Sequence, residues 1–383
     1  MKKKILFMIG NLNVGGVQKS LLSLLHYFDY EKYDVSLLIL ENKNIFIDKV
    51  PPEVNVMTDV FDDSIFHKPI NSITNLINNK KYKYVVLKIF QLICQLFNKG
   101  IGALILSKIM IMQISNKKFE NDFDVAIDYG GQQILYFMVD YINASKKVTY
   151  FHNDYAKWDY YYLMDRKYYK KVDYIVTVSD LCAKSLFEYF PQVGLKIKVI
   201  ENIVDFETME LYSEQINFHI IKNCFTIMTT GRVCQDKGVD IAIEAARILK
   251  SKKIQFKWYW IGPGSTSSYD YSDIESSFEF LGMIPAPFQV LKYCDLYVQP
   301  SRFEGKAMTI EEAKILGIPI IATKFSTVDN QITENVNGFI CEINAESVAE
   351  TIENFIKQRH PLKFPKNAGN KEEIEKLYAL IEA

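Results

Sequence analysis

The chain has few cysteines and histidines, and neither type of residue forms a recognisable pattern. The six cysteines of this 383-residue sequence are scattered, with no C-x-x-C pair and no histidine cluster. Neither a disulfide framework nor a zinc site is therefore indicated. Apolar runs are also short: none reaches the ~18 residues of a membrane span, and the N-terminal run is too brief for a signal peptide. These absences favour a cytoplasmic chain.

Internal repeats, low-complexity tracts and linkers rich in Pro, Gly or Ser are absent as well. Hydrophobic residues make up 49% of the sequence and charged residues 24%, which is close to the globular average and excludes a disordered chain. At about 100 to 200 residues per domain, the length predicts two or three domains.

Acidic residues are missing from one long segment. Residues 64–119 contain no Asp or Glu but nine lysines, Lys117 and Lys118 among them, and two apolar runs, Tyr84–Phe97 and Ile101–Ile114. Such a stretch fits a pair of helices lying on an anionic membrane, and the Tyr- and Trp-rich segment Asp154–Tyr162 would suit the edge of a bilayer. The alternative is a pair of core helices with solvated lysines at their ends.

The sequence does contain a strand, loop and helix that carry two carboxylates. Tyr293–Pro300 reads as a buried strand and Ala307–Leu316 as a helix. Glu304 lies in the loop before this helix and Glu312 lies inside it, with seven residues between them. The adjacent Glu311 does not have this spacing. A helix start favours an anionic ligand such as a phosphate, and flanking carboxylates can accept hydrogen bonds from the hydroxyls of a nucleotide sugar.

A second unit of this kind carries two cations. The strand Phe225–Thr230 leads into Gly231-Arg232-Val233-Cys234-Gln235-Asp236-Lys237-Gly238 and then into an amphipathic helix, Val239–Lys250. Arginine offers a planar fork to a phosphate and lysine a flexible point charge, a pairing that suits a diphosphate. Strands and helices alternate from Phe225 to Ile340, as in a doubly wound parallel sheet with its ligand groups at the carboxyl ends of the strands.

The N-terminal segment is a similar strand, glycine turn and helix. A Walker A loop would need a lysine where Gly16 stands, and Gly10, Gly15 and Gly16 do not make the dinucleotide pattern G-x-G-x-x-G. Further along, the strand Lys147–Phe151 delivers His152 to its carboxyl end.

In this order, the motifs resemble the retaining glycosyltransferases of the GT-B fold, family 4 type (glycosyltransferase group 1), which include enzymes of capsular and exopolysaccharide biosynthesis. The resemblance implies an α/β fold of two Rossmann-like doubly wound domains that face each other across a cleft. It implies an acceptor-binding domain at 1–200, a donor-binding domain at 201–368, and a C-terminal helix within 369–383 that packs back on the first domain.

The resemblance also implies roles for particular residues. Glu304 would contact the transferred sugar, His152 would position it, and Glu312 would bind the ribose. The residues expected at the donor diphosphate are Arg232, Lys237, Gly16, Gly305, Lys306, Ala307, Met308 and Thr309. Those expected at the acceptor or in the cleft are Gly15, Gln18 and Asn153, where Gln18 replaces the usual glutamate of the family and drops its charge.

The expected reaction moves a sugar from a nucleotide-sugar donor to a saccharide or lipid-linked saccharide acceptor. No metal or other cofactor and no nucleic acid is expected, because two cations and a helix start already suit the diphosphate; the pair Asp122 and Asp124 at a strand start is commonplace. Two alternatives stay open: a non-catalytic partner subunit, favoured by Gln18 and by an altered segment at Glu201–Asp205, and a nucleotide-sugar epimerase of the same fold. A cytoplasmic location at the inner face of the membrane is expected.

Overall fold

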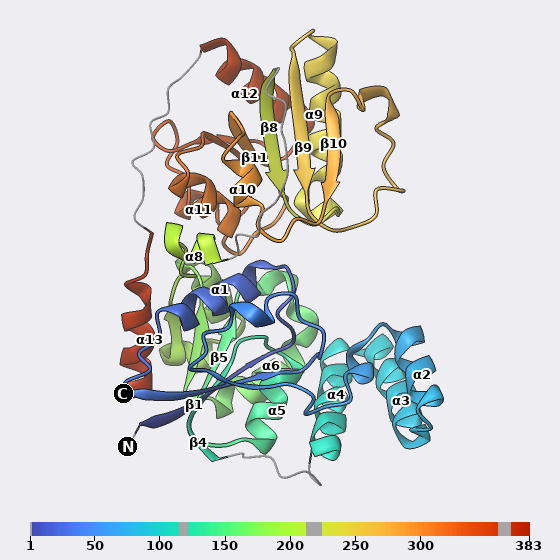
Figure 1. Ribbon diagram of the computed structural model, residues 1–383, viewed down its shortest axis with the longest axis vertical. Coiled ribbons are helices and arrows are strands. Elements are labelled where there is room, and N and C mark those ends of the chain that lie inside the picture. Colours follow the sequence, from blue (N-terminus) through green and yellow to red (C-terminus); the bar gives the residue numbers. More distant parts are fainter. Residues whose placement is uncertain (1, 115–121, 212–223, 359–368) are drawn as a thin grey trace. The chain divides into compact units, whose positions relative to one another are not determined.

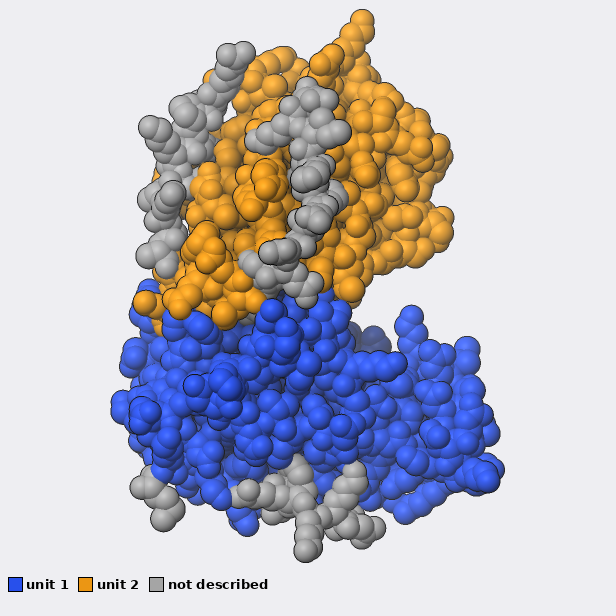
Figure 2. Space-filling model, viewed as in Figure 1, with its two compact units in different colours: residues 1–202, 372–383 blue, residues 203–371 orange. Residues whose placement is uncertain are grey.

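The protein folds into two compact units. The computed structural model describes residues 2–114, 122–211, 224–358 and 369–383. One unit comprises residues 1–202 and 372–383, and the other comprises residues 203–371 (Figure 2). The unit boundary thus falls two residues beyond the position 200 predicted from the sequence. Lys117 and Lys118 of the acid-free segment lie outside the described residues.

The first unit is built on a parallel sheet of seven strands in the order β3-β2-β1-β4-β5-β6-β7 (Figure 1). Its strands are β1 (Lys3–Ile9), β2 (Tyr33–Ile39), β3 (Asn55–Met57), β4 (Asp122–Asp128), β5 (Asn143–Phe151), β6 (Tyr174–Thr177) and β7 (Ile197–Val199). In register, Phe7 pairs with Leu37 on one side and Ile127 on the other. Because helices cover both faces of such a sheet, β1 is an almost continuous apolar run and is buried from Ile5 onward.

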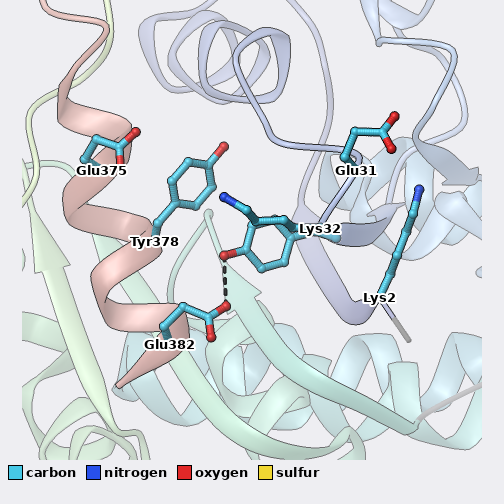
Figure 3. Close-up of a pocket in the computed structure, with 7 residues that line it drawn as sticks. Lys2, Glu31, Lys32, Glu375, Tyr378 and Glu382 are labelled. Atoms are coloured by element: carbon cyan, nitrogen blue, oxygen red, sulfur yellow. Dashed lines mark hydrogen bonds between the residues drawn. The ribbon is translucent and has the colours of Figure 1, made fainter.

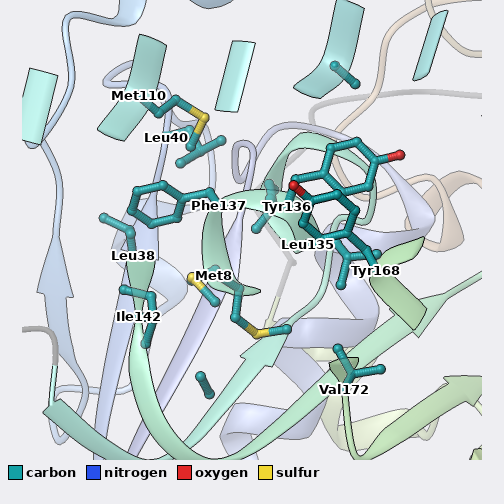
Figure 4. Packing of buried hydrophobic residues seen from close by; sticks show 14 of the residues in the cluster. Met8, Leu38, Leu40, Met110, Leu135, Tyr136, Phe137, Ile142, Tyr168 and Val172 are labelled. Atoms are coloured by element: carbon teal, nitrogen blue, oxygen red, sulfur yellow. The ribbon is translucent and has the colours of Figure 1, made fainter. Parts of the chain in front are cut away.

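Helices surround this first sheet and bury its core. They are α1 (Gly16–His26), α2 (Pro69–Asn78), α3 (Tyr82–Phe97), α4 (Lys99–Ile114), α5 (Gln133–Tyr141), α6 (Tyr162–Tyr168) and α7 (Asp180–Tyr189). Met110 of α4 and Phe137 of α5 pack in one cluster with Met8 and Leu38 of the sheet (Figure 4).

The C-terminal helix α13 (Glu373–Glu382) belongs to the first unit although it follows the second in sequence. Its Tyr378 ring stacks on Tyr33 with centroids 5.4 Å apart, and Tyr33 donates a hydrogen bond of 2.9 Å to Glu382. Glu382 also pairs with Lys3 at 2.6 Å. A shallow pocket of about 570 Å³ lies between α13 and the starts of β1 and β2 (Figure 3). Its lining mixes acidic and basic side chains and indicates no particular ligand.

The second unit holds a parallel sheet of six strands in the order β10-β9-β8-β11-β12-β13. The strands are β8 (Phe225–Thr230), β9 (Phe256–Ile261), β10 (Phe278–Gly282), β11 (Leu296–Gln299), β12 (Ile320–Thr323) and β13 (Phe339–Cys341). The helices are α8 (Phe206–Leu211), α9 (Val239–Ser251), α10 (Phe288–Leu291), α11 (Met308–Ile315) and α12 (Ala345–Gln358). Trp258 and Trp260 are fully buried in this unit.

Both sheets change winding direction at one point. In the first sheet the chain builds outward from β1 to β3 and then returns to place β4 beside β1; in the second it builds outward from β8 to β10 and returns to place β11 beside β8. The carboxyl ends of the strands at such a switch point form the crevice in which open α/β sheets bind ligands. The expected doubly wound α/β architecture is confirmed in each unit.

Candidate functional site

Two loops meet at the switch point of the second sheet, one after β8 and one after β11. Gly238 has φ +72°, and a Cβ there would lie 1.8 Å from the carbonyl oxygen of Pro300. Only glycine permits this close approach of the two backbones. The start of the first loop is held by Trp260, whose indole Nε1 donates to the carbonyl of Gly231 at 2.8 Å. Residues far apart in sequence are thereby brought together.

The cation of one loop binds the carboxylate of the other. Lys237 Nζ lies 2.6 Å from Glu304 Oε1 and 2.7 Å from Oε2. The Lys237 side chain is 23% exposed and that of Glu304 only 10%, so the pair lies at the edge of the protein interior. Two residues that the sequence assigned to the sugar and to the diphosphate are thus in direct contact.

Glu304 also accepts hydrogen bonds from residues that were not predicted from the sequence. Its Oε1 accepts hydrogen bonds from Gln299 Nε2 at 2.9 Å and Ser301 Oγ at 2.8 Å, and its main-chain carbonyl accepts one from Thr327 at 3.0 Å. Tyr297 continues the network through its hydroxyl, which contacts Gln299 and Thr309. The carboxylate therefore has a fixed position, which a binding group needs.

Helix α11 begins just beyond this carboxylate. The side chain of Gln331 accepts from the Ala307 N–H and donates to the Ala307 carbonyl, both at 2.9 Å. Ala307 was predicted to lie at the donor diphosphate, but its N–H already donates a hydrogen bond to Gln331. Glu311 is held by Gln331 at 2.8 Å and by Lys314 at 3.1 Å, whereas Glu312 is 3% exposed inside the helix.

The two arginines of this region differ in surroundings. Arg232, predicted to bind the diphosphate, lies exposed just after β8. Arg302 makes a bidentate pair with Asp240, with both N–O distances 2.7 Å, and donates to the carbonyl of Gln235 at 2.7 Å. Burial alone would raise the pKa of Asp240, but the hydrogen bonds and charge of Arg302 outweigh it and lower that pKa. Arg302 thereby fixes the loop that carries Lys237.

In the first unit, the predicted glycine turn begins α1. Gly15 is the residue before the helix and is extended, with φ −179°, and the helix itself begins at Gly16. The side chain of Gln18 folds back over this turn: a Cβ on Gly15 would lie 2.3 Å from Gln18 Oε1, and Gln18 Nε2 donates to Asn11 at 3.3 Å. Gln18 therefore has a local role in the turn.

His152 follows β5 directly and is enclosed by aromatic rings. Its ring centroid lies 4.7 Å from that of Tyr129 and 5.6 Å from that of Tyr150. The residue as a whole is half-buried, but both ring nitrogens are inaccessible to water and make no hydrogen bond of standard geometry. Burial lowers the pKa of His152 to about 4, against a smaller upward influence of Tyr129 and Asn202. The imidazole is therefore neutral at pH 7. Asn153 comes next in the chain.

A polar network beside His152 was not predicted. The Ser20 hydroxyl donates to Asn202 Oδ1 at 2.7 Å and lies 2.8 Å from the Tyr129 hydroxyl. The three residues come from α1, the end of β4 and the segment after β7, so no local sequence pattern links them.

Two other sequence features have structural partners. Asp124 accepts a hydrogen bond from the Lys4 N–H at 2.8 Å and Asp122 one from Asn143 at 2.7 Å, at the amino end of β4 and so away from the carboxyl edge of the sheet. The altered segment at 201–205 begins with Glu201, whose N–H donates to Glu373 at 2.9 Å. Among the described residues, no three His, Cys, Asp or Glu side chains are grouped so as to hold a metal ion.

The fold places the chain in a known class. Over 99% of its length it superimposes on HepE of Anabaena, solved in complex with UDP and glucose, with a TM-score of 0.67, covering 98% of that chain at 15% identity. A variant of S. aureus TarM, in complex with Fondaparinux, alpha-GlcNAc-glycerol and UDP, superimposes over all of both chains with a TM-score of 0.66 at 15% identity. The chain has the GT-B fold.

A family model matches most of the second unit. Residues 214–373 match the family of glycosyl transferases group 1. The chain thus contains a glycosyltransferase group 1 domain, and this domain carries Lys237, Glu304 and Glu312.

Relatives of known name agree with this family. The chain is 25% identical over 174 residues to the uncharacterized glycosyltransferase MJ1059 of Methanocaldococcus jannaschii, covering 43% of each chain. It is 27% identical over 203 residues to the capsular polysaccharide biosynthesis glycosyltransferase CapM of Staphylococcus aureus, covering 46% of this chain and 52% of CapM. An Escherichia coli UDP-Gal:alpha-D-GlcNAc-diphosphoundecaprenol alpha-1,3-galactosyltransferase is 27% identical over 182 residues, covering 43% of this chain and 45% of that enzyme. The matches thus span about half the length of these relatives.

Proposed function

We propose that the protein is a glycosyltransferase that moves a sugar from a nucleotide-sugar donor to a saccharide or lipid-linked saccharide acceptor in the assembly of a surface polysaccharide. The observation that carries this proposal is the contact of Lys237 with Glu304 at the switch point of a glycosyltransferase group 1 domain. The acceptor class is supported by the names of CapM and of the galactosyltransferase that acts on a diphosphoundecaprenol-linked sugar.

The second unit would bind the donor. Lys237 has three N–H donors, so it can keep its contact with Glu304 while it neutralises a diphosphate oxygen. Arg232, exposed after β8, would bind the other phosphate, and the start of α11 adds the positive end of a helix dipole. In this proposal the charge on the leaving diphosphate is stabilised by these groups without a metal ion.

Glu304 would then orient the sugar. In the described structure its Oε1 accepts hydrogen bonds from Lys237, Gln299 and Ser301, whereas Oε2 accepts one, from Lys237. Because a carboxylate oxygen has two lone pairs, Oε2 can accept a further hydrogen bond from a sugar hydroxyl. Glu312, about one turn from the start of α11, is proposed to bind the ribose.

The proposed chemistry retains the configuration of the anomeric carbon. The bond from this carbon to the diphosphate oxygen breaks, the acceptor oxygen forms the new bond on the same face, and the leaving phosphate takes the acceptor's proton. His152 is neutral at pH 7 because burial lowers its pKa to about 4, so it is not a general acid. Its proposed contact with the sugar requires that its ring nitrogens, which are buried in the described structure, become exposed. An inverted product anomer would contradict this mechanism.

The donor site can be tested before the acceptor is known. Thermal unfolding is measured with a panel of nucleoside diphosphates and nucleotide sugars, for the wild type and for Arg232→Ala and Lys237→Ala. A ligand at 100 times its Kd should stabilise the folded protein by about 2.7 kcal/mol. We expect the nucleoside diphosphate and nucleotide sugars of one base to stabilise the wild type. This stabilisation should be lost in both variants and kept in the control Lys357→Ala, which removes an exposed lysine of α12.

The same experiment separates the alternatives. A non-catalytic partner subunit would show no stabilisation by any nucleotide, and that result would remove the proposal. An epimerase would bind the donor but convert it without an acceptor, which chromatography of the nucleotide sugar after incubation detects.

A further inference from the structure

Helix α3 has its apolar side facing outward. Six large apolar residues are exposed along it, namely Val86, Ile89, Phe90, Ile93, Leu96 and Phe97, and we call this set the α3 face. At 3.6 residues per turn, these positions fall within an arc of about 120°. Leu96 is 87% exposed and Phe97 86%. A helix of a soluble protein normally turns such an apolar stripe toward the core. Because the α3 face points outward instead, it adds little to the buried core of this unit.

The opposite side of α3 buries polar groups instead. Lys88 is 5% exposed, and its ammonium donates to the carbonyl of Ile65 at 2.8 Å. Gln91 is 2% exposed and donates to Gln95 at 2.7 Å. The alternative of core helices with solvated lysines at their ends describes only part of α3. Its terminal lysines are exposed and Val85 and Leu87 pack against the core, but Lys88 is buried and the α3 face is exposed.

The position of α3 leaves its outer side open. It packs on α2 and α4, and α4 in turn packs on α5 and α6, so α3 lies on the side of α4 away from the sheet (Figure 1). Leu163 of α6, 59% exposed, and Tyr160, whose ring lies 3.8 Å from Lys99 Nζ, are further exposed side chains of this unit. No other part of the described chain covers the α3 face.

Positive charge borders the α3 face at both ends of the helix. No Asp or Glu occurs between positions 64 and 119. Lys81 is neutralised by Asp62 at 2.7 Å, but Lys80 and Lys83 are exposed at the start of the helix. At its end, Lys99 lies over the Tyr160 ring at 3.8 Å. An apolar stripe with lysines at both ends is complementary to an anionic, partly apolar surface, and a second copy of the same face would bring like charges together.

We propose that the α3 face docks the protein on an anionic lipid bilayer, with α3 lying along the interface and its apolar side chains among the acyl chains. At 16 residues, α3 is about 24 Å long, which is less than the ~30 Å hydrocarbon core. No helix among the described residues is long and apolar enough to cross a membrane. The docking does not depend on the proposed transferase activity, and it would bring the protein to a lipid-linked acceptor.

The test measures binding to vesicles by co-sedimentation. Vesicles of phosphatidylcholine are compared with vesicles of equal parts phosphatidylcholine and phosphatidylglycerol, using the full chain and the double variant Leu96→Glu with Phe97→Glu. We expect binding to the anionic vesicles to be about tenfold tighter, to weaken with salt, and to fall at least about tenfold in the double variant. Exchange of Lys80, Lys83 and Lys99 for Gln should weaken anionic binding and leave the apolar face intact.

The matched control is Leu195→Glu, since Leu195 is 94% exposed in the first unit but belongs to a different segment, Pro191–Lys196. This variant should bind vesicles like the wild type. Unchanged thermal unfolding of the double variant shows that it is folded. The proposal is overturned if anionic vesicles are not bound at low salt, if Leu195→Glu weakens binding equally, or if the substitutions instead dissolve a dimer seen by light scattering.

Discussion

The contact between Lys237 and Glu304 makes a sharp prediction about stability. Replacing Lys237 by Met leaves a carboxylate whose side chain is 10% exposed without its cation. Removing one partner of a fully buried pair costs about 3–5 kcal/mol, and an exposed pair contributes about 0–1 kcal/mol. Because Lys237 is 23% exposed and Glu304 keeps hydrogen bonds from Gln299 and Ser301, we expect an intermediate loss of about 2 kcal/mol.

The double variant Lys237→Met with Glu304→Gln should recover about half of this loss. It removes the buried charge, and the amide oxygen at position 304 can still accept from Gln299 and Ser301. Urea unfolding is followed by tryptophan fluorescence, since two of the three tryptophans, Trp258 and Trp260, are buried in the second unit.

The reasoning would be refuted if the losses of unfolding free energy in the two single variants simply added up in the double variant. Additive losses would mean that Lys237 and Glu304 do not interact, because water already screens their charges. A loss in Lys237→Met no larger than in Lys357→Met would refute it as well. Lys357 is 68% exposed in its pair with Glu353 and should contribute at most about 0.5 kcal/mol.

Three further predictions concern other side chains. Asp165 of α6 is fully buried, and burial raises its pKa to about 7, so its stabilising contribution is complete below pH 4 and is lost as the pH rises through 7. Asp165→Asn should therefore cost more at pH 5 than at pH 8, by about 3 kcal/mol in urea unfolding, and equal costs would contradict this. Burial lowers the pKa of His152 to about 4, so its contribution is present above pH 6.5 and lost as the pH falls through 4; His152→Gln should lose less stability than the wild type between pH 7 and 4. Arg302→Lys breaks the bidentate pair with Asp240 and should weaken nucleoside diphosphate binding about fivefold, as measured by calorimetry. The control Arg247→Lys alters a surface pair of the same unit and should leave this affinity unchanged. Equal effects of the two substitutions would show that Arg302 does not position the binding loop.

The elements of the fold were predictable because the pattern is local. Strands buried on both faces appear as apolar runs, so β8 was predicted with the bounds that it has, Phe225–Thr230. The predicted strand Tyr293–Pro300 corresponds to the shorter β11. Glycine turns after β1 and β8 marked the carboxyl ends of the strands, where ligand groups gather in doubly wound sheets. Fold class and the neighbourhood of Glu304 followed from the sequence for this reason.

Partners distant in sequence were not predictable. Arg302 and Asp240 are 62 residues apart and Ser20 and Asn202 are 182 apart, and no periodicity links such positions. Placing the carboxylate of Glu304 on the ammonium of Lys237 needs the close approach of Gly238 to Pro300, which only the packed backbones define.

Helix α3 illustrates the division most clearly. Its sequence determined that a basic, acid-free helix forms there, because helical spacing and charge are properties of the local chain. Which side faces outward was decided by tertiary structure: Lys88 is buried and donates to the carbonyl of Ile65, whereas the α3 face lies on the surface. Local sequence determines which elements form, and their mutual packing decides which of their groups meet.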